Sequence, residues 1–131
     1  ARLAQAGLAA EVVQADLLDW MPAAPFDAIW DQACLCALHP DLWFAYAQRL
    51  AAWLRPGGTL CLLAVQVDRE GRREGRIEGP PYHCDVNAVR ALFPAGRWQW
   101  PPPPYPRHAH PAGFAELQVV LARRAESPEA A

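Results

Sequence analysis

The sequence predicts an α/β fold, because two apolar strand-like runs flank a segment with helical periodicity. The first run, residues 26–31, is short and mostly apolar and ends in Asp31. The second run, residues 59–65, is continuously apolar, which is typical of a strand that helices cover on both faces. Residues 40–54, between the two runs, repeat apolar side chains at helical spacing. These observations predict a strand–helix–strand unit with two parallel strands and a right-handed crossover.

Signals at both ends of residues 40–54 support a helix there. Pro40 stands near the start, and Asp41 lies in the first turn, where negative charge is favoured. The turn at residues 55–58, Arg-Pro-Gly-Gly, ends the helix. The apolar positions on the predicted buried side are Trp43, Ala47, Leu50 and Leu54.

The remaining predicted elements are shorter. Residues 10–15 have strand composition, and residues 86–93 have helical spacing with Asp85 as the capping residue. The other expected elements are a helix over residues 1–7 ended by Gly7, a short strand over 97–100 and a final strand over 117–122. The prolines at 101–104 are extended, and they form either a stiff connector or a ligand for an aromatic groove of a partner.

Composition and charge exclude several classes of protein. The chain has 131 residues, of which 53% are hydrophobic, so it is long and apolar enough for one core. A formal net charge of −2 gives no reason to expect nucleic acid or an anionic membrane as a partner. No apolar run approaches the ~20 residues that a membrane-spanning helix needs. We therefore expect a cytoplasmic, monomeric protein whose partner is a small molecule.

Four cysteines raise the question of a metal site. Cys34 and Cys36 are separated by a single residue, whereas zinc sites usually space their first pair by two to four residues. We therefore expect reduced thiols and no metal. The other two cysteines are Cys61, in an apolar run, and Cys84, in a proline-rich loop.

A family resemblance is carried by two stretches, FDAIWDQACLCALHPDLWFAYAQRLAAWLRPGGTLCLL and, downstream, EGPPYHCDVNAVRALF. Together they resemble the thiopurine S-methyltransferase family of class I S-adenosylmethionine-dependent methyltransferases. The Pro-Gly-Gly turn is common to many methyltransferases, and its combination with Gly-Pro-Pro-Tyr at residues 79–82 is more specific. From residue 10 to residue 124 the chain follows the carboxyl-terminal part of that family.

The resemblance implies a partial Rossmann-like sheet in residues 1–124, with parallel strands, an antiparallel edge strand and helices on both faces. Residues 125–131 are expected to form a flexible tail. Such a methyltransferase normally begins with a strand and a glycine-rich loop, which this sequence lacks, so we expect the natural amino terminus to lie upstream of Ala1. Two functions stay open. One is a methyltransferase acting on a small thiol, selenol or related soft nucleophile, and the other is a truncated, non-catalytic remnant or interaction module with the same fold.

The resemblance also implies which residues contact S-adenosylmethionine. Asp16 and Leu17, after the strand expected at residues 10–15, correspond to adenine contacts, and Asp31 and Gln32 lie beside the cofactor. The carboxyl ends of strands are where ligands bind in open α/β sheets. Without the resemblance, Asp16 is better explained as the cap of the turn that follows it. The family usually has arginine where this chain has Gln32, so an anionic group there loses a charge-assisted contact worth up to ~1.5–3 kcal/mol.

The acceptor is expected to meet Cys34, Pro81 and Tyr82. Two prolines stiffen the segment before Tyr82, and the preceding glycine permits a bend. His83 is either a base or, as we favour, a residue packed in the loop. No strong catalytic base is evident near these residues. An acceptor that arrives ionised, such as a thiolate, suits this site better than an alcohol.

The polar segment at residues 66–78 contains four arginines balanced by four carboxylates. A solvated flexible loop is the favoured interpretation, and a phosphate or nucleic-acid patch is the alternative. The arginines are Arg69, Arg72, Arg73 and Arg76, and the carboxylates are Asp68, Glu70, Glu74 and Glu78.

Overall fold

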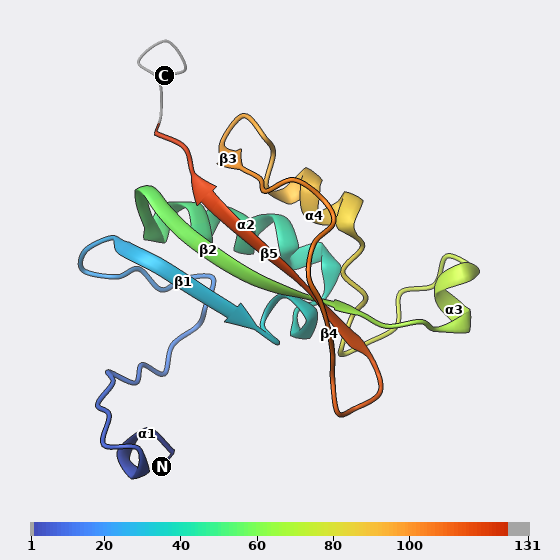
Figure 1. Ribbon diagram of the computed structural model, residues 1–131, viewed down its shortest axis with the longest axis horizontal. Helices are drawn as coiled ribbons and strands as arrows, with labels where there is room; N and C mark the ends of the chain where they lie inside the picture. The colour runs from blue at the N-terminus through green and yellow to red at the C-terminus, as the bar shows by residue number, and fades with distance from the viewer. Residues whose placement is uncertain (1, 126–131) are drawn as a thin grey trace.

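The computed structural model describes residues 2–125 and contains one mixed, five-stranded sheet (Figure 1). The strands are β1 (Phe26–Gln32), β2 (Leu54–Gln66), β3 (Trp98–Gln99), β4 (Arg107–Ala109) and β5 (Ala115–Arg123), and the sheet order is β1-β2-β5-β3, with β4 also paired to β5. The α-helices are α1 (Arg2–Gln5), α2 (Trp43–Trp53), α3 (Glu70–Arg73) and α4 (Val86–Leu92). Two 3-10 turns, η1 (Leu35–Ala37) and η2 (Pro40–Leu42), connect β1 to α2. None of these helices is long and apolar enough to cross a membrane.

The predicted strand–helix–strand unit is confirmed. Strands β1 and β2 are parallel, with Ile29 opposite Leu60 and Asp31 opposite Leu62, and α2 lies between them in the chain. The helix ends where Leu54 adopts an extended backbone. Gly57, near the start of β2, has a φ of +82°, a left-handed conformation that only glycine adopts easily, so the Pro-Gly-Gly residues form an irregular first part of this strand.

Strand β5 confirms the predicted final strand, and it pairs antiparallel with β2 from Thr59–Ala122 to Gln66–Ala115. The resemblance implies that this final strand is the antiparallel edge strand, which is wrong, because β3 and β4 pair with its outer side. Strand β4 consists of three exposed residues without apolar alternation, so its composition does not indicate a strand.

Most of the core lies on one face of the sheet. Both α2 and α4 pack there, and they contact one another. The buried residues of the sheet on that face include Leu60, Leu62, Val119 and Leu121. On the opposite face Trp30, Cys61 and Val120 lie side by side across three strands, and Trp30 is 62% exposed. The second layer of helices expected from the resemblance is therefore not found among residues 2–125.

The predicted strand at residues 10–15 is not formed. These residues make no backbone hydrogen bond within the described chain, and Val12 is 88% exposed. Strand composition is not enough by itself, because a strand needs a neighbour that satisfies its backbone groups. Before this segment, α1 ends at Gln5, and Gly7, two residues later, has a φ of +73°, the left-handed conformation expected of a glycine that follows a helix. Of the expected tail at 125–131, residues 126–131 lie outside the described part of the chain.

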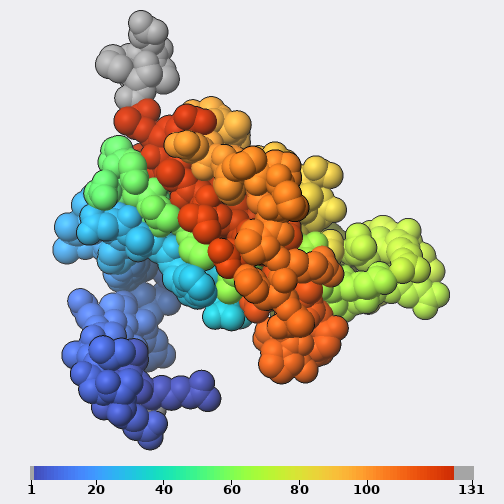
Figure 2. All heavy atoms as spheres, viewed as in Figure 1, coloured from blue at the N-terminus to red at the C-terminus, as the bar shows by residue number. Residues whose placement is uncertain are grey.

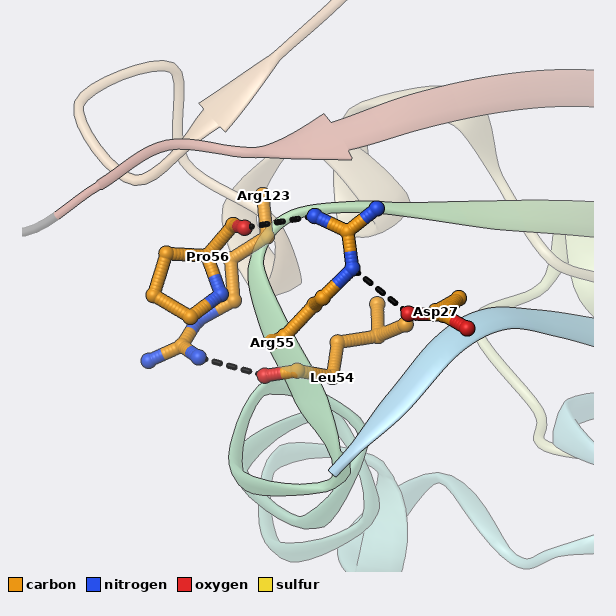
Figure 3. A network of polar contacts seen from close by, with 5 residues as sticks. All are labelled: Asp27, Leu54, Arg55, Pro56 and Arg123. Atoms are coloured by element: carbon orange, nitrogen blue, oxygen red, sulfur yellow. Dashed lines mark hydrogen bonds and ion pairs between the residues drawn. The ribbon is translucent and has the colours of Figure 1, made fainter. Parts of the chain in front are cut away.

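A polar network joins three strands at the amino end of β1 (Figure 3). Arg55 Nε donates to Asp27 Oδ1 at 2.7 Å, which connects β2 to β1. Arg123, on β5, donates to the carbonyl oxygen of Leu54 at the start of β2. This network holds the end of the sheet opposite to the carboxyl ends of β1 and β2.

Candidate functional site

The carboxyl end of β1 carries a buried carboxylate. Asp31 is 2% exposed, and the hydroxyl of Tyr46 on α2 donates to its Oδ2 at 2.6 Å. The backbone N–H of Cys34 donates to the other oxygen, Oδ1, at 3.1 Å. Burial raises the pKa of Asp31, while the hydrogen bond from Tyr46 acts in the opposite direction. Both carboxylate oxygens are thus engaged within the protein, and Asp31 fixes the start of the loop 33–38.

The loop begins with an unusual backbone turn between Gln32, the last residue of β1, and Cys34. Ala33 has a φ of +66°, an unusual backbone conformation for a residue with a side chain. Gln32 is exposed, and its Nε2 makes a long contact of 3.5 Å to Glu116 Oε1. Burial raises the pKa of the Cys34 thiol and raises that of Cys36 to about 11. Neither thiol is therefore activated as a nucleophile.

Tyr82 lies against the same loop, although it is distant in the sequence. Its backbone N–H donates to the carbonyl oxygen of Cys36 at 2.7 Å, and its ring packs edge-on against His39 with 5.5 Å between centroids. A Cβ at Gly79 would lie 2.5 Å from the Tyr82 ring, so glycine is required for the ring to sit there. The preceding Pro81 is partly buried, and its carbonyl oxygen accepts a hydrogen bond from Arg69 at 2.7 Å. The structure thus brings Asp31, Gln32, Cys34, Pro81 and Tyr82 to one edge of the sheet.

His83 is held in the loop by its ring nitrogen. The backbone N–H of Val67 donates to His83 Nδ1 at 3.1 Å. Burial and the nearby charge of Arg72 lower the pKa of His83. A neutral imidazole that accepts a backbone hydrogen bond is the geometry expected of the packing role.

Two cavities flank Val67, just beyond the carboxyl end of β2. One, of about 160 Å³, lies between the start of α2 and the segment 68–83, and Trp43, Ile77 and Tyr82 contribute its apolar walls. The other, of about 540 Å³, is more open and lies toward β4 and the residues that precede β5. Ligands of open α/β sheets bind at such strand ends.

Asp16 and Leu17 are not brought to this edge. Asp16 Oδ1 accepts a hydrogen bond from the backbone N–H of Leu18 at 3.0 Å, the capping geometry that the sequence alone predicts. Leu17 lines an apolar hollow with Phe26 and Trp53, toward the amino end of β1.

Sequence reasoning did not identify Tyr46 and Trp43 as residues of the site. Tyr46 binds the buried carboxylate, and Trp43 Nε1 donates at 2.9 Å to both Leu35 and Leu38 carbonyl oxygens, which closes η1 against α2. Both residues lie on the buried side of the predicted helix. A hydroxyl or indole N–H on such a side needs a partner when buried, which is a signal available from the sequence. Among residues 2–125 no group of His, Cys, Asp and Glu side chains is arranged to hold a metal ion.

Comparison with known proteins places these residues in a family. The probable thiol methyltransferase 2 of Arabidopsis thaliana is 37% identical over 82 residues, which cover 62% of this chain and 34% of that protein. The thiopurine S-methyltransferase of Legionella pneumophila strain Corby is 41% identical over 69 residues, covering 53% of this chain and 29% of that protein. The chain therefore matches about a third of the length of these relatives.

The fold is also found among solved structures. A Burkholderia thailandensis 1,6-didemethyltoxoflavin-N1-methyltransferase, solved with 1,6-didemethyltoxoflavin and S-adenosylhomocysteine, superposes with a TM-score of 0.63. It is 22% identical, and the match covers 86% of this chain and 50% of that one, so the likeness concerns the fold alone. The family model described as thiopurine S-methyltransferase (TPMT) matches residues 4–100, which include the loop after β1 and the Tyr82 segment. The chain belongs to the thiopurine S-methyltransferase family.

Proposed function

We propose that the protein transfers a methyl group from S-adenosylmethionine to a small thiol, selenol or related soft nucleophile. The observation that carries this proposal is the edge at which Asp31 and Tyr46 fix the loop 33–38 next to Tyr82, in a chain of this family. Relatives that match the chain are a thiol methyltransferase and a thiopurine S-methyltransferase.

The side chains at this edge fit a bound S-adenosylmethionine in different ways. Gln32 is exposed and can donate a hydrogen bond from its amide, so we assign it a direct contact. Asp31 acts as a positioning residue, because both of its oxygens already accept hydrogen bonds. We also propose that Asp16 and Leu17 contact the adenine of the cofactor. That role requires residues 10–17 to lie at the carboxyl edge of the sheet and not beside Phe26 and Trp53 as they do here.

The chemistry at this edge favours an acceptor that arrives ionised. When bound, S-adenosylmethionine supplies a sulfonium methyl group, which a thiolate takes to form a thioether and S-adenosylhomocysteine. His83 is engaged by a backbone N–H, and burial raises the pKa of Cys34, so neither serves as a general base. The protein's contribution is then orientation and the exclusion of water by Tyr82 and Trp43. A thiol with a pKa of about 8.5 or lower supplies thiolate near neutral pH without a base.

A matched pair of acceptors tests the proposal. The protein translated from the complete gene is incubated with labelled S-adenosylmethionine and either thiophenol or phenol, and the methylated products are separated and counted. We expect methyl thioether from thiophenol and little or no methyl ether from phenol. Faster turnover of phenol, or transfer to neither acceptor nor to a selenol, contradicts the proposal.

A further inference from the structure

Only two charged side chains are buried among residues 2–125, and both lie at the edge of the sheet where β1 and β2 end. Asp31 is 2% exposed and Glu116, on β5, is 6% exposed. Because β5 runs antiparallel to β2, Glu116 lies opposite Val65, one residue before the end of β2. Figures 1 and 2 show the hairpin of β4 and β5 beside the carboxyl end of β1. The two carboxylates thus belong to the edge at which the cofactor is proposed to bind.

The two buried carboxylates differ in the hydrogen bonds that they receive. Asp31 accepts a hydrogen bond of 2.6 Å from Tyr46 on one oxygen and one of 3.1 Å from the backbone of Cys34 on the other. Glu116 accepts one long hydrogen bond, from Gln32 Nε2 to its Oε1 at 3.5 Å, and within residues 2–125 its Oε2 has no hydrogen-bond partner. A buried charge without a close partner is unfavourable, and a ligand of opposite charge removes that cost.

No cationic side chain among residues 2–125 forms an ion pair with Glu116. The residue opposite it on β4 is His108, whose Nε2 lies 2.9 Å from Gln118 Oε1. Successive side chains of a strand point to opposite faces, so Arg107, which precedes His108, faces away from Glu116. The charge of Glu116 instead acts on the loop after β1, where it contributes to the raised pKa of the Cys36 thiol. Glu116 therefore places a negative charge at this edge of the sheet.

The contact with Glu116 also fixes which way the Gln32 amide points. An ionised carboxylate only accepts hydrogen bonds, so the Nε2 end of the amide has to face it. The carbonyl oxygen Oε1 of Gln32 and its second N–H then remain for a ligand. Gln32 is exposed, and it is the residue to which the proposed function gives a direct contact with the cofactor. The carboxylate of Glu116 therefore lies directly behind that contact.

We propose that Glu116 shifts the affinity of the cofactor site toward S-adenosylmethionine and away from its product, S-adenosylhomocysteine. The inference rests on the proposed function, which places the cofactor at this edge. The two compounds differ by one methyl group and by the positive charge of the sulfonium, so the negative charge of Glu116 stabilises the first more than the second. A buried charge is also less screened by salt than an exposed one. Loss of the sulfonium charge during methyl transfer then weakens binding of the product and favours its release.

Calorimetric titration with both compounds tests this effect without any methyl transfer. We would compare the ratio of the two dissociation constants in the full-length protein and in Glu116→Gln, which keeps the shape of the side chain and removes its charge. The affinity for S-adenosylmethionine should fall about tenfold relative to the affinity for S-adenosylhomocysteine. Glu116→Asp, which keeps the charge on a shorter side chain, should retain part of the wild-type ratio. A purely structural role for Glu116 would lower both affinities equally.

Glu70→Gln is the matched control, because it removes the same charge from the exposed surface of α3, where Glu70 lines neither cavity. It should keep the wild-type ratio. An unchanged ratio in Glu116→Gln, the same change in both glutamine variants, or a wild type that binds neither compound overturns the inference. Methyl transfer to thiophenol together with an unchanged ratio refutes this inference and leaves the proposed function standing. A ratio that changes in Glu116→Gln without transfer to any thiol does the reverse.

Discussion

Replacement of Tyr46 by Phe isolates the hydrogen bond that holds the loop after β1. The hydroxyl lies 2.6 Å from Asp31 Oδ2, and both side chains are buried, so the variant leaves one carboxylate oxygen without its donor. Phenylalanine keeps the ring and creates almost no cavity. A hydrogen bond to a charged group is worth about 1.5–3 kcal/mol, and we expect the free energy of unfolding near neutral pH to fall by that amount.

The pH dependence of this loss follows from the pKa of Asp31. The bond from Tyr46 opposes the rise in pKa that burial causes, so Tyr46→Phe raises the pKa of Asp31 further. A carboxyl group whose pKa is raised in the folded state favours folding when it is protonated. The free energy of unfolding therefore falls as the pH rises from the ordinary pKa of the group through its folded pKa. The full loss of stability in the variant is expected above the folded pKa of Asp31 in both wild type and variant. Acidification protonates Asp31 and reduces the difference in stability between the two proteins.

Urea unfolding at about pH 7.5 and about pH 4.5 measures both effects. In an Asp31→Asn background, which removes the titrating group, the cost of Tyr46→Phe should not change between these pH values. A cost below about 0.5 kcal/mol at the higher pH would contradict the proposed strength of the bond. A cost that fails to shrink on acidification would contradict the assignment of its pH dependence to Asp31.

Three further predictions concern packing, the acceptor segment and pH. Leu50→Ala, at a position with 0% exposure, should cost about 2–5 kcal/mol in urea unfolding, whereas Phe44→Ala on the exposed side of α2 should stay within about 0.5 kcal/mol. Gly79→Ala should lower the melting temperature and weaken acceptor binding, because the added Cβ would lie 2.5 Å from the neighbouring tyrosine ring; Gly96→Ala, with nothing within 4 Å, should do neither. His83 has a lowered folded pKa, so stability should be full above its ordinary pKa of 6.5 and fall as pH drops below it; His83→Gln should flatten that slope in thermal melts, and an unchanged slope would count against the assignment.

The parts of the fold that the sequence predicted are those that local signals determine. Residues 26–65 carry a buried strand, a helix with a start and stop signal, and a second strand, and all three form. Residues 10–15 have comparable strand composition, but they have no neighbouring strand to pair with, a condition that composition does not report. Strand β4 was not predicted, because its three exposed residues lack strand composition and form a strand only by pairing with β5.

For the candidate site, the sequence indicated which residues lie at the carboxyl end of β1 but not the contacts that they make. Asp31 and Gln32 end strand β1 and Cys34 lies just after it, and the resemblance added Tyr82, which the fold brings to the same loop. The partner of Asp31 is a side chain 15 positions away on the next helix, and its identity depends on how α2 packs. Which carboxylates pair with Arg72, Arg73 and Arg76 depends in the same way on the distances between side chains, since the sequence alone shows only balanced charge.

The polar network at the amino end of β1 lies far from the cavities, so the contacts that join the strands and the residues that line the cavities are at opposite ends of the sheet. Arg55, Asp27 and Arg123 connect β1, β2 and β5 at one end of the sheet, while both cavities lie beyond the other end of β2. Exchanges in the segment 68–83 therefore leave the fastened end intact. Substitutions that accumulate in the segment 68–83 during evolution can therefore change the acceptor proposed for this site, while the pairing of the strands is kept.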